Sequence, residues 1–347
     1  MDRTEIETGP PASCLRVLYV IPGAEKDTSM SFSRRQAASV GKFGVEIRQF
    51  FLKSRTSPPV IARELRRLKR EIRKFEPHVV HAHFGTMTAF VAAIASRKPL
   101  VITFHGSDLN PAPGDPWLRS KLGHALSHFA ANRAAEIICV SPQLRERLAN
   151  QQARIHVVPC GVNLEQFSPL AKRDCRDRLG WNLDEKIVLF NARTDPEGKR
   201  LDLAEAAILH AQRKTPQLRL HVFRGKTHPD DMPIYYSAAD ALLMTSDYEG
   251  SPMVVKEALA CNLPVVSVDV GDVVERLQGV TPSAIVPRSP AAIGEALADV
   301  LHKNIRSNGR DRVHELSEDH VARTITSIYR LAAHMPASGP RENRIAA

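Results

Sequence analysis

Short runs of apolar residues alternate with longer amphipathic stretches along most of this 347-residue chain. The short runs are typical of buried strands, and the longer stretches have helical spacing. Repetition of strand, helix and strand predicts parallel sheets covered by helices on both faces. A first series of predicted strands comprises Leu15–Ile21, Val45–Phe51, Val79–Ala82, Leu100–Thr103 and Glu136–Val140. A second series comprises His156–Val158, Ile187–Phe190, Leu218–Phe223, Ala241–Met244, Val265–Val268 and Ala284–Val286.

The alternation breaks at Pro159–Leu179, which contains several turn formers and no apolar run of strand length. This break predicts two domains, and the length of the chain favours the same division. We expect a first doubly wound domain over 14–165, a linker over 166–179 and a second doubly wound domain over 180–310. The fold class is therefore predicted to be α/β, with two Rossmann-like domains facing a cleft.

The two ends of the chain differ from this pattern. A final helical stretch over 311–334 follows the second sheet, and we expect it to cross back to the first domain. The segments 1–13 and 335–347 lack periodicity and are expected to be flexible tails. No apolar run approaches the roughly 20 residues that cross a bilayer, and the N-terminus lacks the apolar core of a signal peptide. We therefore expect a cytoplasmic protein.

The segment Val60–Phe75 is predicted to be an amphipathic helix with a basic polar face. Its apolar stripe consists of Ile61, Leu65, Leu68, Ile72 and Phe75. Its cations are Arg63, Arg66, Arg67, Lys69, Arg70, Arg73 and Lys74. Two interpretations stay open, a solvated surface or a face that rests on an anionic membrane. The second interpretation would place the protein peripherally on the inner face of the membrane.

The chain as a whole carries a formal net charge of +10, which attracts polyanions such as phosphorylated substrates, lipid headgroups or nucleic acid. Nucleic acid is disfavoured as a partner, because there is no zinc finger and aromatic residues make up only 5%. The five cysteines are scattered without a CxxC spacing. That distribution argues against a disulfide framework and against a zinc site.

Chemistry is expected in the loops that follow strands, because doubly wound domains bind ligands beyond the carboxyl ends of their strands. After the strand Ala241–Met244 comes the loop Glu249–Pro252, and a helix is expected from about Met253 to Cys261. The start of this helix offers unpaired N–H groups and a partial positive charge, which suit an anion or sugar hydroxyls. Glu249 lies just before the start of this helix, and Glu257, about two turns further along, is placed to hold the diol of a ribose.

The string EGSPMVVKEALACNLPVVSVDVGDVVE, which begins at Glu249, resembles the donor-site signature of the GT-B glycosyltransferases, in particular the retaining family 4 type. That signature is a Glu, seven residues and a second Glu, followed by a small-residue helix end, a Pro and a buried strand. The resemblance implies sugar transfer from a nucleotide sugar, with Glu249 on the donor sugar and Glu257 on the ribose. It also implies contacts to the sugar and phosphates from the backbone of Gly250, Ser251, Pro252, Met253 and Val254.

A second stretch, NARTDPEGKRLDLAEAAI, supports the same family in the second domain. Arg193 and Lys199 lie in a loop that enters a helix, and their charges suit a pyrophosphate. The family has an Arg followed shortly by a Lys in this role, although the residue after that Lys is usually Gly and here is Arg200. By resemblance, Arg193 and Lys199 are expected to bind the donor.

Two further stretches support the family in the first domain. VITFHGSDL resembles its His-Gly-x-Asp loop, which implies that His105 and Asp108 face the donor sugar. VVHAHFGT resembles the strand and loop that line the acceptor side. Its His81 and His83 alternate along a strand, so one is expected in the core and the other in the cleft, with His83 as the cleft candidate. We expect no metal site here, since no third ligand is evident.

His105 and Glu249 are the expected catalytic groups. No DxD pair follows a predicted donor-side strand, so transfer is expected to need no metal and no cofactor. The resemblance implies retention of configuration, and the basic charge is compatible with a lipid-linked acceptor in cell-surface polysaccharide or glycoconjugate assembly. A nucleotide-sugar epimerase or hydrolase of the same fold, and a non-catalytic sugar-nucleotide-binding protein, stay open as alternatives.

Two stretches depart from the family pattern. The first loop has Gly23 alone where the family has a Gly-Gly pair, so acceptor contacts there are not assigned. The stretch from Gly225 to Tyr235 is short where the family has an additional helix and strand near the nucleotide base. The sequence therefore predicts a nucleotide-sugar donor without identifying its base, its sugar or the acceptor.

Overall fold

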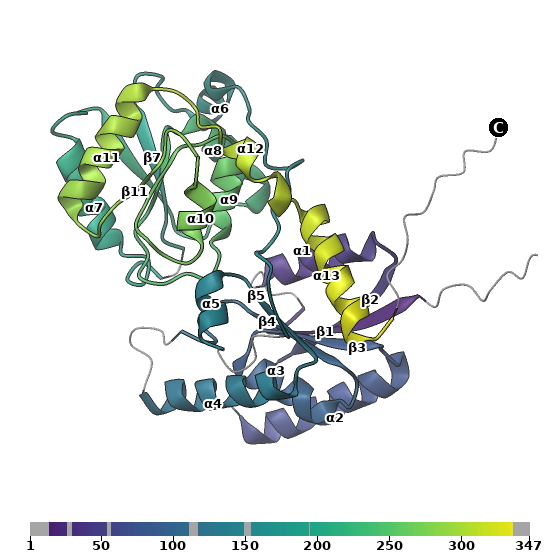
Figure 1. Ribbon diagram of the computed structural model, residues 1–347. Coiled ribbons are helices and arrows are strands. Elements are labelled where there is room, and N and C mark those ends of the chain that lie inside the picture. The colour runs from purple at the N-terminus through teal and green to yellow at the C-terminus, as the bar shows by residue number, and fades with distance from the viewer. Residues whose placement is uncertain are drawn as a thin grey trace, which may run out of the picture.

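The computed structural model contains two domains, and it describes residues 14–25, 30–53, 57–110, 117–148, 154–193 and 195–335. The predicted tail 1–13 lies outside these residues, as does all of the predicted tail 335–347 except Met335. Each domain is built on a parallel sheet with helices on both faces (Figure 1). The predicted α/β class with two Rossmann-like domains is confirmed.

The first domain has a six-stranded parallel sheet in the order β2-β1-β3-β4-β5-β6. Its strands are β1 (Leu15–Pro22), β2 (Val45–Leu52), β3 (Val79–His83), β4 (Leu100–Phe104), β5 (Glu136–Cys139) and β6 (Ile155–Val157). Its helices are α1 (Ser31–Gly41), α2 (Pro58–Phe75), α3 (Thr86–Ala95), α4 (Trp117–Arg133) and α5 (Pro142–Glu146). The helices α2, α3 and α4 cover one face of the sheet, whereas α1 and the C-terminal helix α13 (Glu318–Ala332) cover the other (Figure 1).

The strand β1 shows why both faces of this sheet are covered. Its side chains alternate between the faces, and those on both faces are apolar and buried. Leu18 and Val20 pack in the core beneath α2, α3 and α4. Val17 and Tyr19 pack in the second core, which includes residues of α1 and α13. A strand with two apolar faces is stable only between two layers of helices.

The second domain has a five-stranded parallel sheet in the order β11-β10-β9-β7-β8. Its strands are β7 (Lys186–Asn191), β8 (Leu218–Phe223), β9 (Ala241–Met244), β10 (Val265–Ser267) and β11 (Ala284–Ile285). Its main helices are α7 (Leu201–Ala211), α8 (Met232–Ala238), α9 (Met253–Ala260), α10 (Val273–Leu277) and α11 (Pro290–Lys303). Short helical turns lie at Pro229–Asp231 and His314–Leu316, and α12 spans Gly309–Arg312.

All eleven predicted strands are present, each within one residue of its expected ends. The strand β6, placed in the second predicted series, pairs with β5 and belongs to the first sheet. The predicted linker 166–179 also needs correction, because its last eight residues form the helix α6 (Lys172–Leu179). Cys175 of α6 packs on α8, and the buried Arg176 donates to the Asp240 carboxylate at 2.7 Å. This helix therefore belongs to the second domain.

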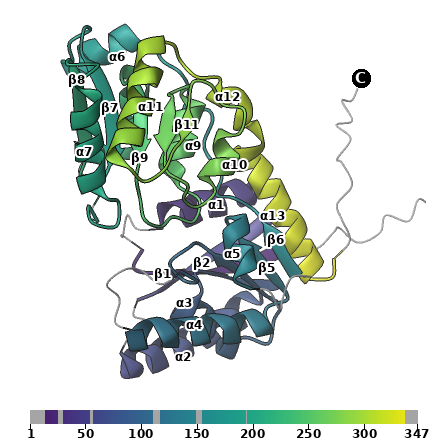
Figure 2. The same ribbon diagram turned by 60° about the vertical axis from the view of Figure 1, so that its left-hand side comes forward.

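The chain connects the domains twice, once before α6 and once before α13. The two connections run beside each other, since Val162 donates its N–H to the Leu316 carbonyl and accepts from the Glu318 N–H. Gly161 allows this approach, because a Cβ there would lie 2.9 Å from the Glu318 Cα. The helix α13 then packs along α1 (Figure 2). Its Tyr329 hydroxyl bonds to the ring Nδ1 of His81 at 2.5 Å.

Candidate active site in the cleft between the domains

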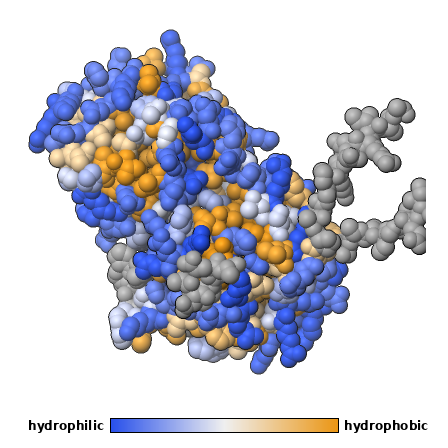
Figure 3. All heavy atoms as spheres, in the orientation of Figure 1, coloured by the Kyte–Doolittle hydropathy of each residue, from blue (hydrophilic) through white to orange (hydrophobic). Residues whose placement is uncertain are grey.

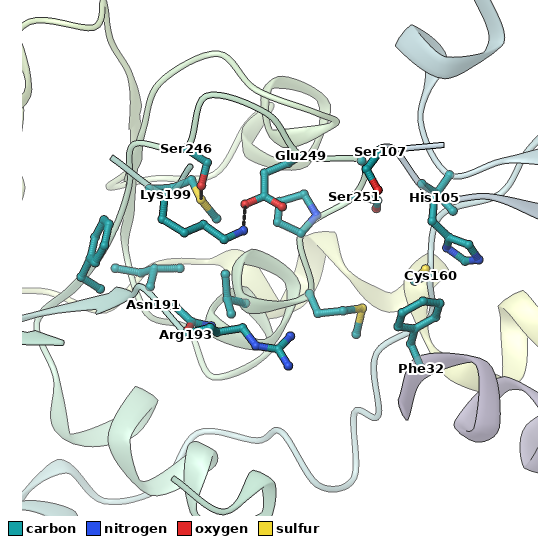
Figure 4. A pocket seen from close by; sticks show the side chains of 18 of the residues that line it. Phe32, His105, Ser107, Cys160, Asn191, Arg193, Lys199, Ser246, Glu249 and Ser251 are labelled. Atoms are coloured by element: carbon teal, nitrogen blue, oxygen red, sulfur yellow. Dashed lines mark hydrogen bonds and ion pairs between the residues drawn. The ribbon is translucent and has the colours of Figure 1, made fainter. Parts of the chain in front are cut away.

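The carboxyl ends of both sheets face a pocket of about 420 Å³ between the domains (Figure 4). The first domain and its connection supply Phe32, Phe84, His105, Ser107, Val140 and Cys160. The second domain supplies Phe190, Asn191, Arg193, Lys199, Leu242, Leu243, Met244, Ser246 and the run Glu249–Val254. In the second sheet the pocket lies between β7 and β9, where the strand order reverses. That reversal is the expected position of a ligand site in a doubly wound fold.

The amino end of α9 opens onto this pocket. Its first residues, Met253 and Val254, line the pocket together with the preceding loop Glu249–Pro252. The first N–H groups of a helix have no partner within the helix and carry a partial positive charge. The structure thus brings the predicted backbone contacts together at one wall, which is suited to an anion.

Gly250 lies at a close contact between the backbones of the two domains. A Cβ atom at this position would lie 2.0 Å from the His105 carbonyl oxygen. On the other side of the contact, Gly106 has a φ of +136°. A Cβ atom built on Gly106 would lie 3.2 Å from the backbone nitrogen of Gly250. Glycine at both positions therefore lets the pocket-lining loops of the two domains touch.

Lys199 and Glu249 form an ion pair inside the pocket, with 2.5 Å between Nζ and Oε1 (Figure 4). Their side chains are 24% and 14% exposed, so the pair is only partly screened by solvent. The Arg193 guanidinium projects into the same pocket and has no ion pair among the described residues (Figure 4). Its backbone is left-handed, with a φ of 45°, a conformation that arginine seldom adopts. The predicted pair of donor-binding cations is thus brought together with the predicted carboxylate.

His105 follows β4 and lies in the pocket beside the ring of Phe32, 4.6 Å away between centroids (Figure 4). Desolvation in the cleft, and next the charge of Lys256, lower the pKa of His105 to about 3. The imidazole is therefore neutral at neutral pH. It can donate or accept one hydrogen bond to a sugar hydroxyl, but it does not supply a positive charge.

Glu257 lies on the buried side of α9 and does not line the pocket. Its Oε2 accepts a hydrogen bond of 3.0 Å from the Tyr236 hydroxyl. Its Oε1 is 4.0 Å from an Arg35 nitrogen, which comes from α1 of the first domain. Burial raises the pKa of Glu257, and Arg35 opposes that shift. The structure places this predicted ribose ligand beneath the pocket wall, in contact with both domains.

Asp108 and His83, expected on the first-domain side of the cleft, are fully buried and line no part of the pocket. The Asp108 carboxylate accepts from the N–H groups of Gly85, His105 and Gly106, at 2.8 to 3.1 Å. It therefore fixes the turn that carries His105. His83 bonds to the Ser33 hydroxyl at 3.1 Å. The expectation that one of His81 and His83 faces the cleft is wrong, because residues two apart in a strand share one face. Here α1 and α13 cover that face, through Ser33 and Tyr329.

The described part of the chain contains no group of three or more His, Cys, Asp or Glu side chains that could hold a metal ion. Glu249 is the one carboxylate among the described residues that line the pocket. The positive charges in the pocket therefore come from Arg193, Lys199 and the start of α9.

Two family descriptions match the chain, one on each domain. "Glycosyltransferase Family 4" matches residues 20–166, and "Glycosyl transferases group 1" matches residues 198–303. The solved structure of sucrose-phosphate synthase from Thermosynechococcus elongatus superposes with a TM-score of 0.75 and 18% identity, covering 91% of this chain and 98% of that one. This chain belongs to the group 1 glycosyltransferase family and has the GT-B fold.

Two further proteins are informative for this glycosyltransferase. The putative teichuronic acid biosynthesis glycosyltransferase TuaC of Bacillus subtilis is 29% identical over 253 residues. That match covers 67% of this chain but only 64% of TuaC, so the chain spans less than two thirds of this relative's length. Alr3699/HepE of Anabaena, solved in complex with UDP, superposes with a TM-score of 0.66 and 15% identity, covering 90% of this chain and 99% of that one.

The sequence did not identify Lys256 of this glycosyltransferase as a site residue. Its side chain is fully buried, and its ammonium donates to the Cys160 carbonyl at 2.8 Å and to the Ser251 hydroxyl at 2.7 Å. Ser251 in turn donates to Asp272 at 2.7 Å. The lysine therefore ties the loop Glu249–Pro252, the proposed donor loop, to the connection between the domains. A lysine on a small-residue, apolar helix face was the available signal, because a buried cation requires partners.

The first-domain pocket residues Phe32, Phe84 and Ser107 were also not predicted. Phe84 follows β3 with a left-handed φ of 79°, so this backbone is strained beside the pocket. Phe32 enters from α1, a helix that contributed no motif to the sequence analysis. Neither feature leaves a pattern of spacing, which is why only the folded chain reveals them.

Proposed function

We propose that this protein transfers a sugar from a nucleotide-sugar donor to a lipid-linked acceptor at a membrane surface, with retention of configuration and without a metal ion. The observation that carries the proposal is the Lys199–Glu249 ion pair at the mouth of α9, with Arg193 in the same pocket. This arrangement has two cations for a diphosphate and one carboxylate for sugar hydroxyls. It also suits a nucleoside diphosphate such as the UDP with which HepE was solved.

The diphosphate of the donor would lie between Arg193, Lys199 and the first N–H groups of α9. Arginine and lysine bind phosphate oxygens through charge-assisted hydrogen bonds. When the sugar–phosphate bond breaks, negative charge grows on the leaving nucleoside diphosphate. Fixed cations and a helix terminus stabilise that charge without reorganising, which supports metal-independent transfer.

The donor sugar would lie between Glu249 and His105, which approach it from opposite domains. When the Lys199 ammonium binds the diphosphate instead of Glu249, the Glu249 carboxylate is free to accept hydrogen bonds from sugar hydroxyls. The neutral imidazole of His105 can donate one more. For Glu257 to hold the ribose, its carboxylate has to reach past the wall that now covers it, and its bonds to Tyr236 and Arg35 have to loosen.

Retention is proposed from the family resemblance, and the pocket composition is compatible with it. Glu249 is the one carboxylate among the described lining residues, and it is paired with Lys199. We assign no covalent nucleophile. The proposed course is attack of the acceptor on the same face of the sugar from which the diphosphate leaves.

The proposed place of the reaction is the assembly of a cell-surface polysaccharide or glycoconjugate. The name of the relative TuaC refers to teichuronic acid biosynthesis, which is support by analogy. The basic outer face of α2 supports an acceptor held at an anionic surface, and with it a peripheral position on the membrane. The described helices include none with the length and apolar character needed to cross a bilayer.

A thermal-shift screen of nucleotide sugars, followed by mass spectrometry of the products with a membrane lipid extract as acceptor, tests the proposal. A stabilising donor should yield a lipid product enlarged by one sugar, and NMR of that product should show the donor's anomeric configuration. Epimerised donor with no enlarged product would support the epimerase alternative instead. Stabilisation without any chemical change would support the non-catalytic alternative.

A further inference from the structure

The helix α4 exposes a row of large apolar side chains to solvent. Trp117, Leu118, Leu122 and Phe129 are between 42% and 71% exposed. Leu118, Leu122, the exposed Ala125 and Phe129 follow one another at spacings of four, three and four residues, which places them on one stripe of the helix. The other exposed large apolar side chains in the described chain occur singly on separate elements. A continuous apolar stripe of this kind marks a contact surface.

Cations border this stripe and continue beyond its end. Lys121 lies over the Trp117 ring at 4.3 Å, and Arg133 lies over the Phe129 ring at 5.8 Å. At the Arg133 end, an open groove of about 730 Å³ runs between α2, α3 and α4. Its charged lining residues are Lys69, Arg73, Arg97, Lys98 and Arg133, and no acidic side chain lines it. None of these five cations forms an ion pair with another described residue.

The outer face of α2 adds further positive charge beside the groove. Its exposed cations are Arg63, Arg66, Lys69, Arg70, Arg73 and Lys74. The two acidic residues of α2 do not offset them, because Glu64 is paired with Arg67 and Glu71 with Arg48. Hydrophilic side chains cover much of this lower part of the molecule in the space-filling view (Figure 3). An apolar stripe beside an uncompensated basic face has the composition of a surface that binds anionic membranes.

We propose that the layer formed by α2, α3 and α4 docks on an anionic lipid bilayer. The apolar stripe of α4 enters the headgroup region, and the five cations of the groove bind lipid phosphates. The inference rests on the proposed function for its membrane acceptor, and it deepens that function by assigning the surface that meets the membrane. A second copy of the chain is a poorer occupant, because a two-fold contact would bring the same uncompensated cations face to face.

The position of α4 relative to the cleft fits this orientation. His105 and Ser107 line the pocket, and Trp117 begins α4 only seven positions after Asn110. Seven residues span at most about 25 Å. A bilayer that contacts the amino end of α4 is therefore within reach of the first-domain side of the cleft.

The test uses Trp117 as its own probe. The chain has two tryptophans, so Trp181→Phe in the full-length protein leaves Trp117 as the sole emitter. Vesicles of phosphatidylglycerol and phosphatidylcholine should shift its emission to the blue, and brominated acyl chains should quench it. Vesicles of phosphatidylcholine alone should do neither. Raised salt should weaken binding, because screening shortens the reach of the cations.

Two double variants separate the contributions of the stripe and the groove. Leu118→Glu with Leu122→Glu, and Arg97→Glu with Lys98→Glu, should each weaken co-sedimentation with anionic vesicles by at least about tenfold. Leu209→Glu is the matched control, since Leu209 is a 68% exposed leucine on α7 of the second domain, and it should bind as the parent does. Circular dichroism and melting temperature confirm that each variant is folded.

Binding unchanged in both double variants would overturn the inference, and so would self-association that only the α4 variant abolishes in the absence of lipid. The assay needs no donor, acceptor or turnover, so it can succeed even where the proposed transfer fails. Conversely, transfer to a lipid acceptor by a protein that binds no vesicles would overturn this inference alone.

Discussion

A Cβ atom on Gly250 would lie 2.0 Å from the carbonyl oxygen of His105, so the two domains meet through backbone at a position that admits only glycine. Gly250 belongs to the loop Glu249–Pro252, and His105 begins the first-domain loop that faces it. The proposed transfer needs both loops around one sugar. The fit at this contact therefore sets how closely the two loops approach each other.

Gly250→Ala is expected to lower turnover at least about tenfold, because the added methyl group holds the loops apart and misplaces the reacting groups. Each domain keeps its own core, so the melting temperature should change little. Gly41→Ala serves as the control, since a Cβ there meets nothing within 4 Å. The expectation is checked by comparing kcat for the two variants on an identified donor. Equal rates would show that the Gly250–His105 contact is not needed for turnover.

Lys256→Met is expected to loosen the arrangement of the domains. The substitution removes the bonds from the ammonium to Cys160 and Ser251, which join the donor loop to the inter-domain connection. Small-angle scattering should show a larger radius of gyration for the unliganded variant than for the parent. Lys226→Met, at an exposed position of the second domain, should leave the radius unchanged. The same radius for both variants would show that the lysine does not hold the domains together.

Acid should destabilise the protein partly through its buried histidines. The folded chain lowers the pKa of both His81 and His105 from 6.5 to about 3, mainly by burial. Between these values the unfolded chain binds more protons, so the free energy of unfolding falls as pH decreases from about 6.5 towards 3. Well above the unshifted pKa of 6.5 these imidazoles are unprotonated in both states, and the contribution is flat.

His105→Gln should reduce this slope by at most about 1.4 kcal/mol per pH unit, the value for one proton. Urea unfolding at a series of pH values between 4 and 7, a range set by the shifted and unshifted histidine pKa values, provides the measurement. A His105→Gln slope equal to the parent's would contradict the assignment of a neutral, desolvated imidazole.

Periodicity and strand length were sufficient to predict both sheets, because strands buried on two faces appear as continuous apolar runs. The donor loop was predictable for a related reason, since its residues are adjacent in the chain and their spacing is fixed by one helix. The linker was less predictable. The helix α6 is stabilised by Arg176, whose partners Ala238 and Asp240 lie more than sixty positions away.

The first-domain side of the cleft was predicted less well. Asp108 and His83 belong to recognisable motifs, but a motif does not reveal which side of its strand or turn faces solvent. For His83 that depends on α1 and α13, and α13 lies more than two hundred residues along the chain from β3. Lys256 was not predicted as a site residue for a similar reason, because its partner Cys160 is far away in the sequence.

The most direct test of the donor site is the binding of a nucleoside diphosphate, measured by calorimetry on the parent, Lys199→Met and Glu249→Gln. We expect Lys199→Met to weaken binding at least about tenfold, because one charge-assisted phosphate contact is lost. Glu249→Gln should bind the diphosphate as well as or better than the parent, because Lys199 no longer has a competing carboxylate, yet turnover of the full donor should be abolished. Unchanged diphosphate affinity in Lys199→Met, together with near-normal turnover in Glu249→Gln, would contradict the account.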